Sequence, residues 1–320
     1  LRSALRWSVP VAAALALAAF AGSRGWGPLG QRSHIRFVVP TLNPQLDPEY
    51  NWAPTLAIGP AGNELILRAG ALLQLRALDD FVPRPLAGTE GASMPAFSPD
   101  GKWIAFQQNG HLRKLALAGG SVVEIAQADV GPGLTWGEDE RIYFSSLGGN
   151  GGIWRVAAAG GIPEAVTEVA DSAAEIAHAW PQLLPGGTTL LYTVVGPSGG
   201  ALDSRVVVET LGSGVRRKLV DQATFGRYVT PGQLLYVSNE GSVFSTPFDV
   251  RRGTVAGVGR QVLPDVMVAS WGGAAIVAVA EGGTVAFEPG SAGAVQVVQT
   301  VDRVGRDLGA ILPAGYVDGV

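Results

Sequence analysis

The sequence contains no cysteine and only three histidines. The absence of cysteine excludes disulfide bonds, thiolate metal sites and a cysteine nucleophile. The three histidines, His34, His111 and His178, share no spacing that is typical of metal ligands. We therefore expect no metal site built from two or three histidines, and no other cofactor.

Charged residues are also scarce. They make up 16% of the chain, against ~25% in an average soluble protein. This composition excludes a coiled coil, a long helical bundle and a charged disordered tail. The net charge is −4 and the isoelectric point is about 5.5, so we expect no nucleic-acid partner.

Glycine, by contrast, is abundant. It accounts for 45 of 320 residues, about twice its usual share. Such a composition is typical of many short strands that are joined by tight turns. The chain is long enough for one large all-β domain with a sizeable core, or for two ordinary domains.

The N-terminal region contains an uncharged, apolar stretch, residues 8–22. As a helix these 15 residues would rise only ~22 Å, less than the ~30 Å hydrocarbon core of a membrane. The wider window from Trp7 to Trp26 is long enough, and its two tryptophans suit the membrane interfaces. We therefore predict a hydrophobic N-terminal helix that anchors the chain in a membrane through residues 7–26, within a first segment of residues 1–30.

Two other interpretations of this segment stay open. In a signal peptide, Arg2 and Arg6 would precede the hydrophobic region, and residues 19–21 (Ala-Phe-Ala) would form the cleavage site. Alternatively, the segment is a buried, alanine-rich helix of a soluble domain. Both the anchor and the signal peptide place the residues after about position 27 outside the cytoplasm.

A degenerate repeat runs through the rest of the chain. Its clearest copy, residues 97–106 (FSPDGKWIAF), has two apolar strands around a Pro-Asp-Gly turn, a sequence that suits a tight turn. Weaker copies occur at spacings of 39, 39, 47, 46 and 50 residues. Their turns are anchored at Pro60, Pro99, Glu138, Pro185, Pro231 and Glu281.

This period is typical of a β-propeller blade, which is roughly 40–50 residues long. We predict an all-β fold: a six-bladed β-propeller of four-stranded antiparallel blades over residues 53–320. Residues 31–52 would be a connector with one strand, at residues 34–39, which could pair with a blade edge. A two-sheet sandwich is the alternative fold, but it does not explain the repeat.

Several of these segments resemble a known group of proteins. Ser98-Pro99-Asp100-Gly101 and residues 177–187 (AHAWPQLLPGG) resemble the TolB-like, WD-repeat-like propellers of bacteria. The order of features, with residues 36–40 (RFVVP) between the hydrophobic segment and the propeller, resembles the C-terminal half of membrane-anchored bacterial serine/threonine protein kinases. Residues 85–91 and 153–156 also fit this group. Only one Pro-Asp-Gly turn is intact, which is a departure from the pattern.

The resemblance implies an extracytoplasmic propeller that senses or binds a protein, a peptide or a cell-envelope ligand and reports to a kinase domain. The 320 residues contain no kinase motif. We therefore expect no catalytic residue and no enzymatic activity in this chain. One alternative is a stand-alone periplasmic TolB-like scaffold. Another is a propeller enzyme, such as a metal-dependent lactonase or a peptidase-associated propeller, although the expected innermost strands are too apolar to supply several metal ligands.

The mouth of the central channel is where we expect a ligand or partner to bind, because binding pockets favour such positions. The candidate residues lie just before the expected innermost strands. They are Glu90, Ser93, Asp129, Glu175, His178, Arg227 and Trp271. Three tryptophans, Trp136, Trp154 and Trp180, are expected to serve as packing residues.

Overall fold

The computed structural model describes residues 36–37, 56–80, 82–146, 148, 151–170, 175–199, 201–238, 240–264, 266–268, 275–290 and 298–300. The chain divides into two units, residues 1–34 and residues 35–320, and all described residues belong to the second. The hydrophobic helix expected at residues 7–26 lies outside them and receives no support from the structure. Among the described residues, no helix has the length and apolar character that crossing a bilayer requires.

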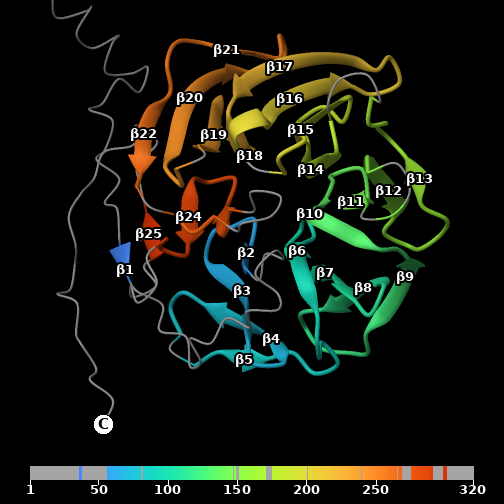
Figure 1. The fold of residues 1–320 in the computed structure, drawn as a ribbon. Helices are drawn as coiled ribbons and strands as arrows, with labels where there is room; N and C mark the ends of the chain where they lie inside the picture. Colours follow the sequence, from blue (N-terminus) through green and yellow to red (C-terminus); the bar gives the residue numbers. More distant parts are fainter. Residues whose placement is uncertain are drawn as a thin grey trace, which may run out of the picture. The chain divides into compact units, whose positions relative to one another are not determined.

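The second unit is a β-propeller whose small antiparallel sheets follow one another around an axis (Figure 1). Five sheets are blades made of strands that are consecutive in sequence. The first two consist of β2 (Leu56–Ile58), β3 (Glu64–Ala69), β4 (Leu72–Ala77) and β5 (Arg84–Pro85), and of β6 (Ser93–Phe97), β7 (Trp103–Gln108), β8 (His111–Ala116) and β9 (Val123–Gln127).

The next three blades follow the same plan, with the first strand innermost. The third consists of β10 (Val130–Trp136), β11 (Arg141–Ser146), β12 (Ile153–Ala157) and β13 (Glu164–Ala165). The fourth consists of β14 (Ala177–Leu183), β15 (Thr189–Val195), β16 (Arg205–Thr210) and β17 (Val215–Asp221), with a short 3-10 helix, η3 (Ala201–Asp203), before β16. The fifth consists of β18 (Ala223–Val229), β19 (Gln233–Ser238) and β20 (Val243–Asp249), and both β21 (Thr254–Val255) and β22 (Arg260–Leu263) pair with β20.

The expectation of six blades, each made of four consecutive strands, is wrong: the described part of the chain contains five. The last repeat unit forms a different sheet, in which β23 (Val277–Val279), β24 (Thr284–Phe287) and β25 (Val298–Thr300) are joined by β1 (Arg36–Phe37). Arg36 pairs with Gln299 and Phe37 with Val298. The outer strand of this sheet therefore comes from the beginning of the unit rather than from its end.

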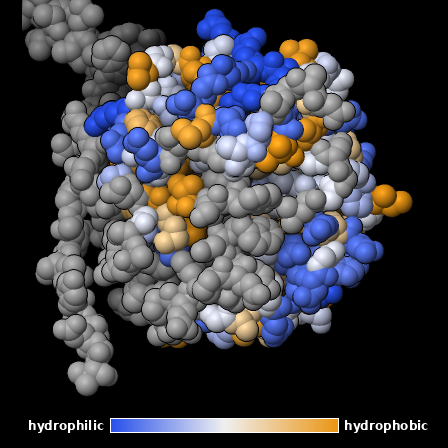
Figure 2. Space-filling view, viewed as in Figure 1, coloured by the Kyte–Doolittle hydropathy of each residue, from blue (hydrophilic) through white to orange (hydrophobic). Residues whose placement is uncertain are grey.

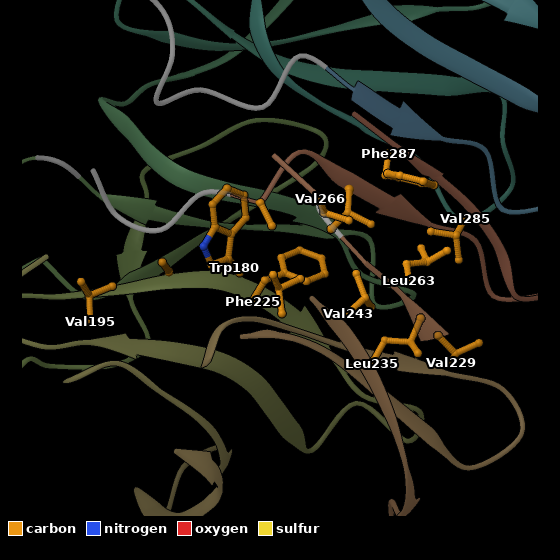
Figure 3. Close-up of a cluster of buried hydrophobic side chains, with 14 residues drawn as sticks. Trp180, Val195, Phe225, Val229, Leu235, Val243, Leu263, Val266, Val285 and Phe287 are labelled. Carbon is orange, nitrogen blue, oxygen red and sulfur yellow. The ribbon is translucent and has the colours of Figure 1, made fainter. Parts of the chain in front are cut away.

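Side-chain packing closes the ring at this sheet. On one side, Ala278 and Ala286 pack with Ile58 and Leu65 of the first blade. On the other side, Figure 3 shows a cluster of buried side chains from the fourth and fifth blades and from β24. Trp180 and Phe225 meet edge to face in this cluster, with ring centroids 5.7 Å apart. A small sheet cannot bury both of its faces alone, so packing against two neighbours stabilises each blade.

The intact Pro-Asp-Gly turn shows why the repeat forms hairpins. The side chain of Asp100 accepts hydrogen bonds from the Ser98 hydroxyl (2.6 Å) and from the Lys102 backbone N–H (3.1 Å). These bonds, with that from Ser98 the strongest, lower the pKa of Asp100 to about 2. Gly101 adopts φ +71°, a left-handed conformation that glycine accepts without a steric penalty. The residues of the turn therefore hold its shape.

Candidate functional site

A cavity of about 340 Å³ lies at the axis of the propeller. The innermost strands of all six sheets line it, and these strands surround the centre of the ring in Figure 1. Each strand contributes apolar side chains, for example Ala57, Ala96, Leu134, Leu183, Phe225 and Val277. Every repeat unit therefore helps to build this cavity.

One innermost strand, β18, has a register shift between Ala223 and Phe225, and three others share an interruption of a different kind where they face this cavity. The pairing register shifts between Ser93 and Ala96 in β6, between Val130 and Leu134 in β10, and between Ala179 and Gln182 in β14. Each interruption contains a proline: Pro95, Pro132 and Pro181. Proline has no N–H to donate to a strand ladder, so it favours a bulge at that point. A proline inside an apolar strand is the sequence signal that could have located these bulges.

The three bulges contact one another around the axis. Met94, Gly133 and Trp180 have positive φ angles of 53°, 105° and 57°. The backbone N–H of Gly133 donates to the sulfur of Met94 at 3.4 Å. A Cβ on Gly133 would lie only 2.6 Å from the backbone nitrogen of Trp180. Glycine is thus required here both by its backbone conformation and by the close approach of β14.

Arg227, in the middle of β18, is the cation that lines this cavity. It donates one hydrogen bond, from Nη1 to the carbonyl oxygen of Pro181 (3.1 Å). No carboxylate of the described residues forms an ion pair with it. Part of its surface faces the cavity and protein encloses the rest, and this burial lowers the pKa of Arg227 to about 10. The guanidinium therefore stays charged at neutral pH.

The other polar groups of the cavity differ in how far they are satisfied. Gln182 accepts a hydrogen bond from the backbone N–H of Tyr228 (2.8 Å) and donates one to its carbonyl oxygen (3.2 Å), which joins β14 to β18. The indole nitrogens of Trp136 and Trp180 are buried and have no hydrogen-bond partner within the described residues. These two tryptophans pack as expected, but they also line the cavity.

Glu175 and His178 belong to a second, separate cluster, which joins the third and fourth blades. The hydroxyl of Thr167 accepts a hydrogen bond from the backbone N–H of Ile153 (2.8 Å) and lies 2.7 Å from Nδ1 of His178. Since this hydroxyl has a proton to donate, we assign Nδ1 as its acceptor, and Nε2–H then donates to Glu175 at 3.3 Å. Burial lowers the pKa of His178 to about 4, although the bond to Glu175 opposes this shift.

Two arginines complete this cluster from the outer strands of the fourth blade. Arg205 and Arg216 both pair with Glu175, and Arg216 also contacts Glu209 at 3.3 Å. Burial alone would raise the pKa of Glu175, but the His178 and Arg216 partners outweigh it and lower that pKa. Figure 2 shows that hydrophilic side chains gather over this blade, at the top of the view. Because His178 is fully buried and its neighbours satisfy it, the cluster has the character of a structural link between blades.

The remaining candidates from the sequence do not join either group. Glu90 and Asp129 are exposed, whereas Ser93 is buried and donates to Gln107 at 3.0 Å. Trp271 lies outside the described residues. The structure thus places Arg227 in the axial cavity, brings Glu175 and His178 together, and leaves the other candidates apart. Within the described ranges, no three His, Asp or Glu side chains come together as a set that could hold a metal ion.

No known family profile matches the chain, and no curated protein is detectably similar to it in sequence. Solved structures do match. TolB from Acinetobacter baumannii is 19% identical, with a TM-score of 0.49; the match covers 62% of this chain and 52% of that chain. This chain therefore matches about half the length of that protein.

Two other structures match over more of their length. A chain of a mitotic checkpoint complex is 12% identical, with a TM-score of 0.55, and the match covers 83% of this chain and 92% of that chain. An oligogalacturonate lyase in complex with manganese is 11% identical, with a TM-score of 0.51, and the match covers 78% of this chain and 77% of that chain. At these identities the matches concern the fold. In fold the chain is a β-propeller, as its repeat implied.

Proposed function

We propose that the chain is a recognition propeller, which binds a partner protein or peptide at its axial cavity. The observation that carries this proposal is the construction of the cavity: six sheets converge on it, three of their inner strands bulge there, and Arg227 supplies one charge. Strand interruptions of this kind re-aim side chains and are frequent next to functional sites. The mitotic checkpoint match is, by its name, part of a protein complex, which supports a protein partner.

We place this propeller outside the cytoplasm, as the sensor region of a membrane-anchored serine/threonine protein kinase. The hydrophobic segment at residues 7–26 and the RFVVP segment at residues 36–40, followed by the propeller, support this assignment. A stand-alone periplasmic scaffold is the rival, and the reading frame upstream of Leu1 separates the two. A kinase-coding region there supports the kinase assignment, whereas a start codon next to Leu1 supports the scaffold.

Reporter fusions test the location directly. Alkaline phosphatase attached after Val320 should be active, and green fluorescent protein at the same position should be dark, because the first folds outside the cytoplasm and the second inside it. The reverse pattern would contradict an extracytoplasmic propeller.

Site-specific photo-crosslinking tests partner binding. Thr135 lines the cavity, whereas Ile162 is 93% exposed on an outer turn. A photoreactive amino acid at position 135 of the full chain, expressed in its native host, should capture a defined protein or peptide. The same probe at position 162 is the matched control and should not capture it. Equal capture at both positions, or none at position 135, would refute the proposal.

Absence of phosphotransfer is part of the same proposal, since the chain contains no kinase motif. The purified full chain should transfer no phosphate from ATP and should not hydrolyse it. A propeller enzyme remains the alternative because an oligogalacturonate lyase shares the fold. Turnover of ATP or of oligogalacturonate in proportion to the amount of chain would replace the recognition function with an enzymatic one.

A further inference from the structure

The guanidinium of Arg227 has more N–H donors than the described residues engage in hydrogen bonds. An arginine side chain carries five N–H donors, yet within the described residues it makes one hydrogen bond, to the carbonyl oxygen of Pro181. Burial is the cause of its lowered pKa, and no nearby charge offsets that burial. Arg227 is partly enclosed by protein, and a partly enclosed charge without a counter-charge is costly, so a protein that keeps one invites a functional explanation.

The surroundings of Arg227 favour a ligand that accepts hydrogen bonds. Trp136 and Trp180 line the same cavity, but their indole nitrogens are buried and offer it no donor. Gln182, the nearby amide, is already bound to Tyr228 through both of its polar atoms. Arg227 therefore supplies the cavity wall with N–H donors that no described residue engages.

We propose that Arg227 binds a carboxylate group in the axial cavity. This deepens the proposed function and rests on it in one respect: the carboxylate is then an acidic side chain or the C-terminus of the partner. The planar guanidinium matches a carboxylate through two parallel hydrogen bonds. The apolar side chains of Leu134, Phe225 and Val277 surround the rest of the inserted group.

The charge balance favours a singly charged group over phosphate. One guanidinium neutralises one carboxylate, whereas phosphorylated groups are usually bound by clusters of arginines. Two carboxylates, those of Glu138 and Glu281, also line the cavity and are exposed at its rim. They repel a doubly charged anion more strongly than a singly charged one.

Calorimetric titration of the full chain tests the carboxylate site with matched pairs of probes. The first pair is propionate and propionamide, which differ in charge and donor pattern and carry at most one negative charge. The second is acetyl-Gly-Glu-Gly-amide and the same peptide with Gln. The third is acetyl-Gly-Gly-Gly with a free or an amidated C-terminus. In each pair that binds, the acid should bind at least about tenfold more tightly than the amide, since a hydrogen-bonded charge pair is worth a factor of this size.

Variants assign the effect to Arg227. Arg227→Gln should weaken binding of the acids at least about tenfold, and Arg227→Lys should bind more tightly than Arg227→Gln because it keeps the charge. Arg251→Gln, an exposed cation in the turn after β20, is the control and should bind like the original chain. Circular dichroism establishes that each variant is folded. If Arg227→Gln does not fold, the acid and amide pairs on the original chain and on Arg227→Lys still decide the question.

The outcomes separate the site from the proposed function. Binding of propionate with rejection of both acidic peptides supports the carboxylate site and contradicts recognition of a partner peptide. Acids that bind no better than their amides overturn the site. Arg227→Gln with unchanged affinity, or inorganic phosphate that binds more tightly than propionate, also overturns it.

Discussion

Acidification should destabilise the propeller through His178. In the folded chain, burial lowers the pKa of this imidazole to about 4, against 6.5 for a free histidine. The unfolded chain therefore takes up this proton at a higher pH than the folded chain does. A difference of about 2.5 pH units, at about 1.4 kcal/mol per unit, gives a loss of roughly 3 kcal/mol in the free energy of unfolding.

The pH window follows from the sign of this shift. Above about pH 6.5 the imidazole is neutral in both the folded and the unfolded chain, so it adds no pH dependence to the free energy of unfolding. Stability falls between about pH 6.5 and pH 4, and the loss is complete below pH 4. The groups that face His178 are Thr167, Glu175, Tyr192, Arg216 and Glu209. The pKa of Glu175 is lowered from 4.5, so its own contribution is lost only below that pH, as the protein acidifies further.

Urea unfolding of the full chain at a series of pH values measures this effect. His178→Gln should be less stable at pH 7, because it disturbs the bonds to Thr167 and Glu175, but its stability should depend less on pH between 6.5 and 4.5. His111→Gln is the control, since His111 is partly exposed on β8 beside Glu124. It should keep the slope of the original chain. If His178→Gln retains that slope, the imidazole is not the titrating group and the reasoning is refuted.

Three further substitutions test the packing, each by urea unfolding. Thr89→Val should lower the free energy of unfolding by about 1–3 kcal/mol, because the fully buried Thr89 hydroxyl accepts a hydrogen bond from the backbone N–H of Leu73 (3.0 Å). Thr89→Ser keeps a hydroxyl and should lower it less. Equal losses for the two variants would contradict the hydrogen-bond explanation. Gly133→Ala should lower the free energy of unfolding by about 3 kcal/mol or more, because of the positive φ at this position and the collision of the added Cβ with Trp180. An unchanged urea midpoint would show that the bulges do not meet as described. Arg227→Met should leave the free energy of unfolding unchanged or raise it, as is common when an apolar group replaces an enclosed charge. A loss of more than about 2 kcal/mol would assign Arg227 a structural role.

The repeat predicted the blades because its turns are local. At Ser98–Gly101, the residues that shape the hairpin are neighbours in sequence, and the same is true of each consecutive pair of strands. The last sheet could not be predicted in full in the same way. Its edge pairs Arg36 with Gln299, a contact that spans almost the whole chain and leaves no local pattern. The sequence suggested a strand at residues 34–39 and a blade edge as its place, but not which blade.

The candidate site was harder to predict for a different reason. Side chains alternate between the two faces of a strand, and a bulge reverses that alternation. A position just before an innermost strand can therefore face the axis or the space between blades. His178 contacts Tyr192, with ring centroids 4.8 Å apart, and lies within the packing of the fourth blade. Arg227, the fifth residue of β18, faces the cavity instead.

The distribution of irregularity around the axis bears on function as well as on fold. Outer strand pairs also have register shifts, but the interruptions of β6, β10 and β14 contain Pro95, Pro132 and Pro181, which lack the N–H that a ladder needs. Backbone strain persists in a folded protein only where the surrounding structure imposes it. Met94 and Trp180 sustain positive φ angles at these bulges, and Arg227 adds an uncompensated charge nearby. Irregular backbone and an unpaired charge thus coincide at one cavity, which is the pattern expected where a surface is shaped for a ligand rather than for stability.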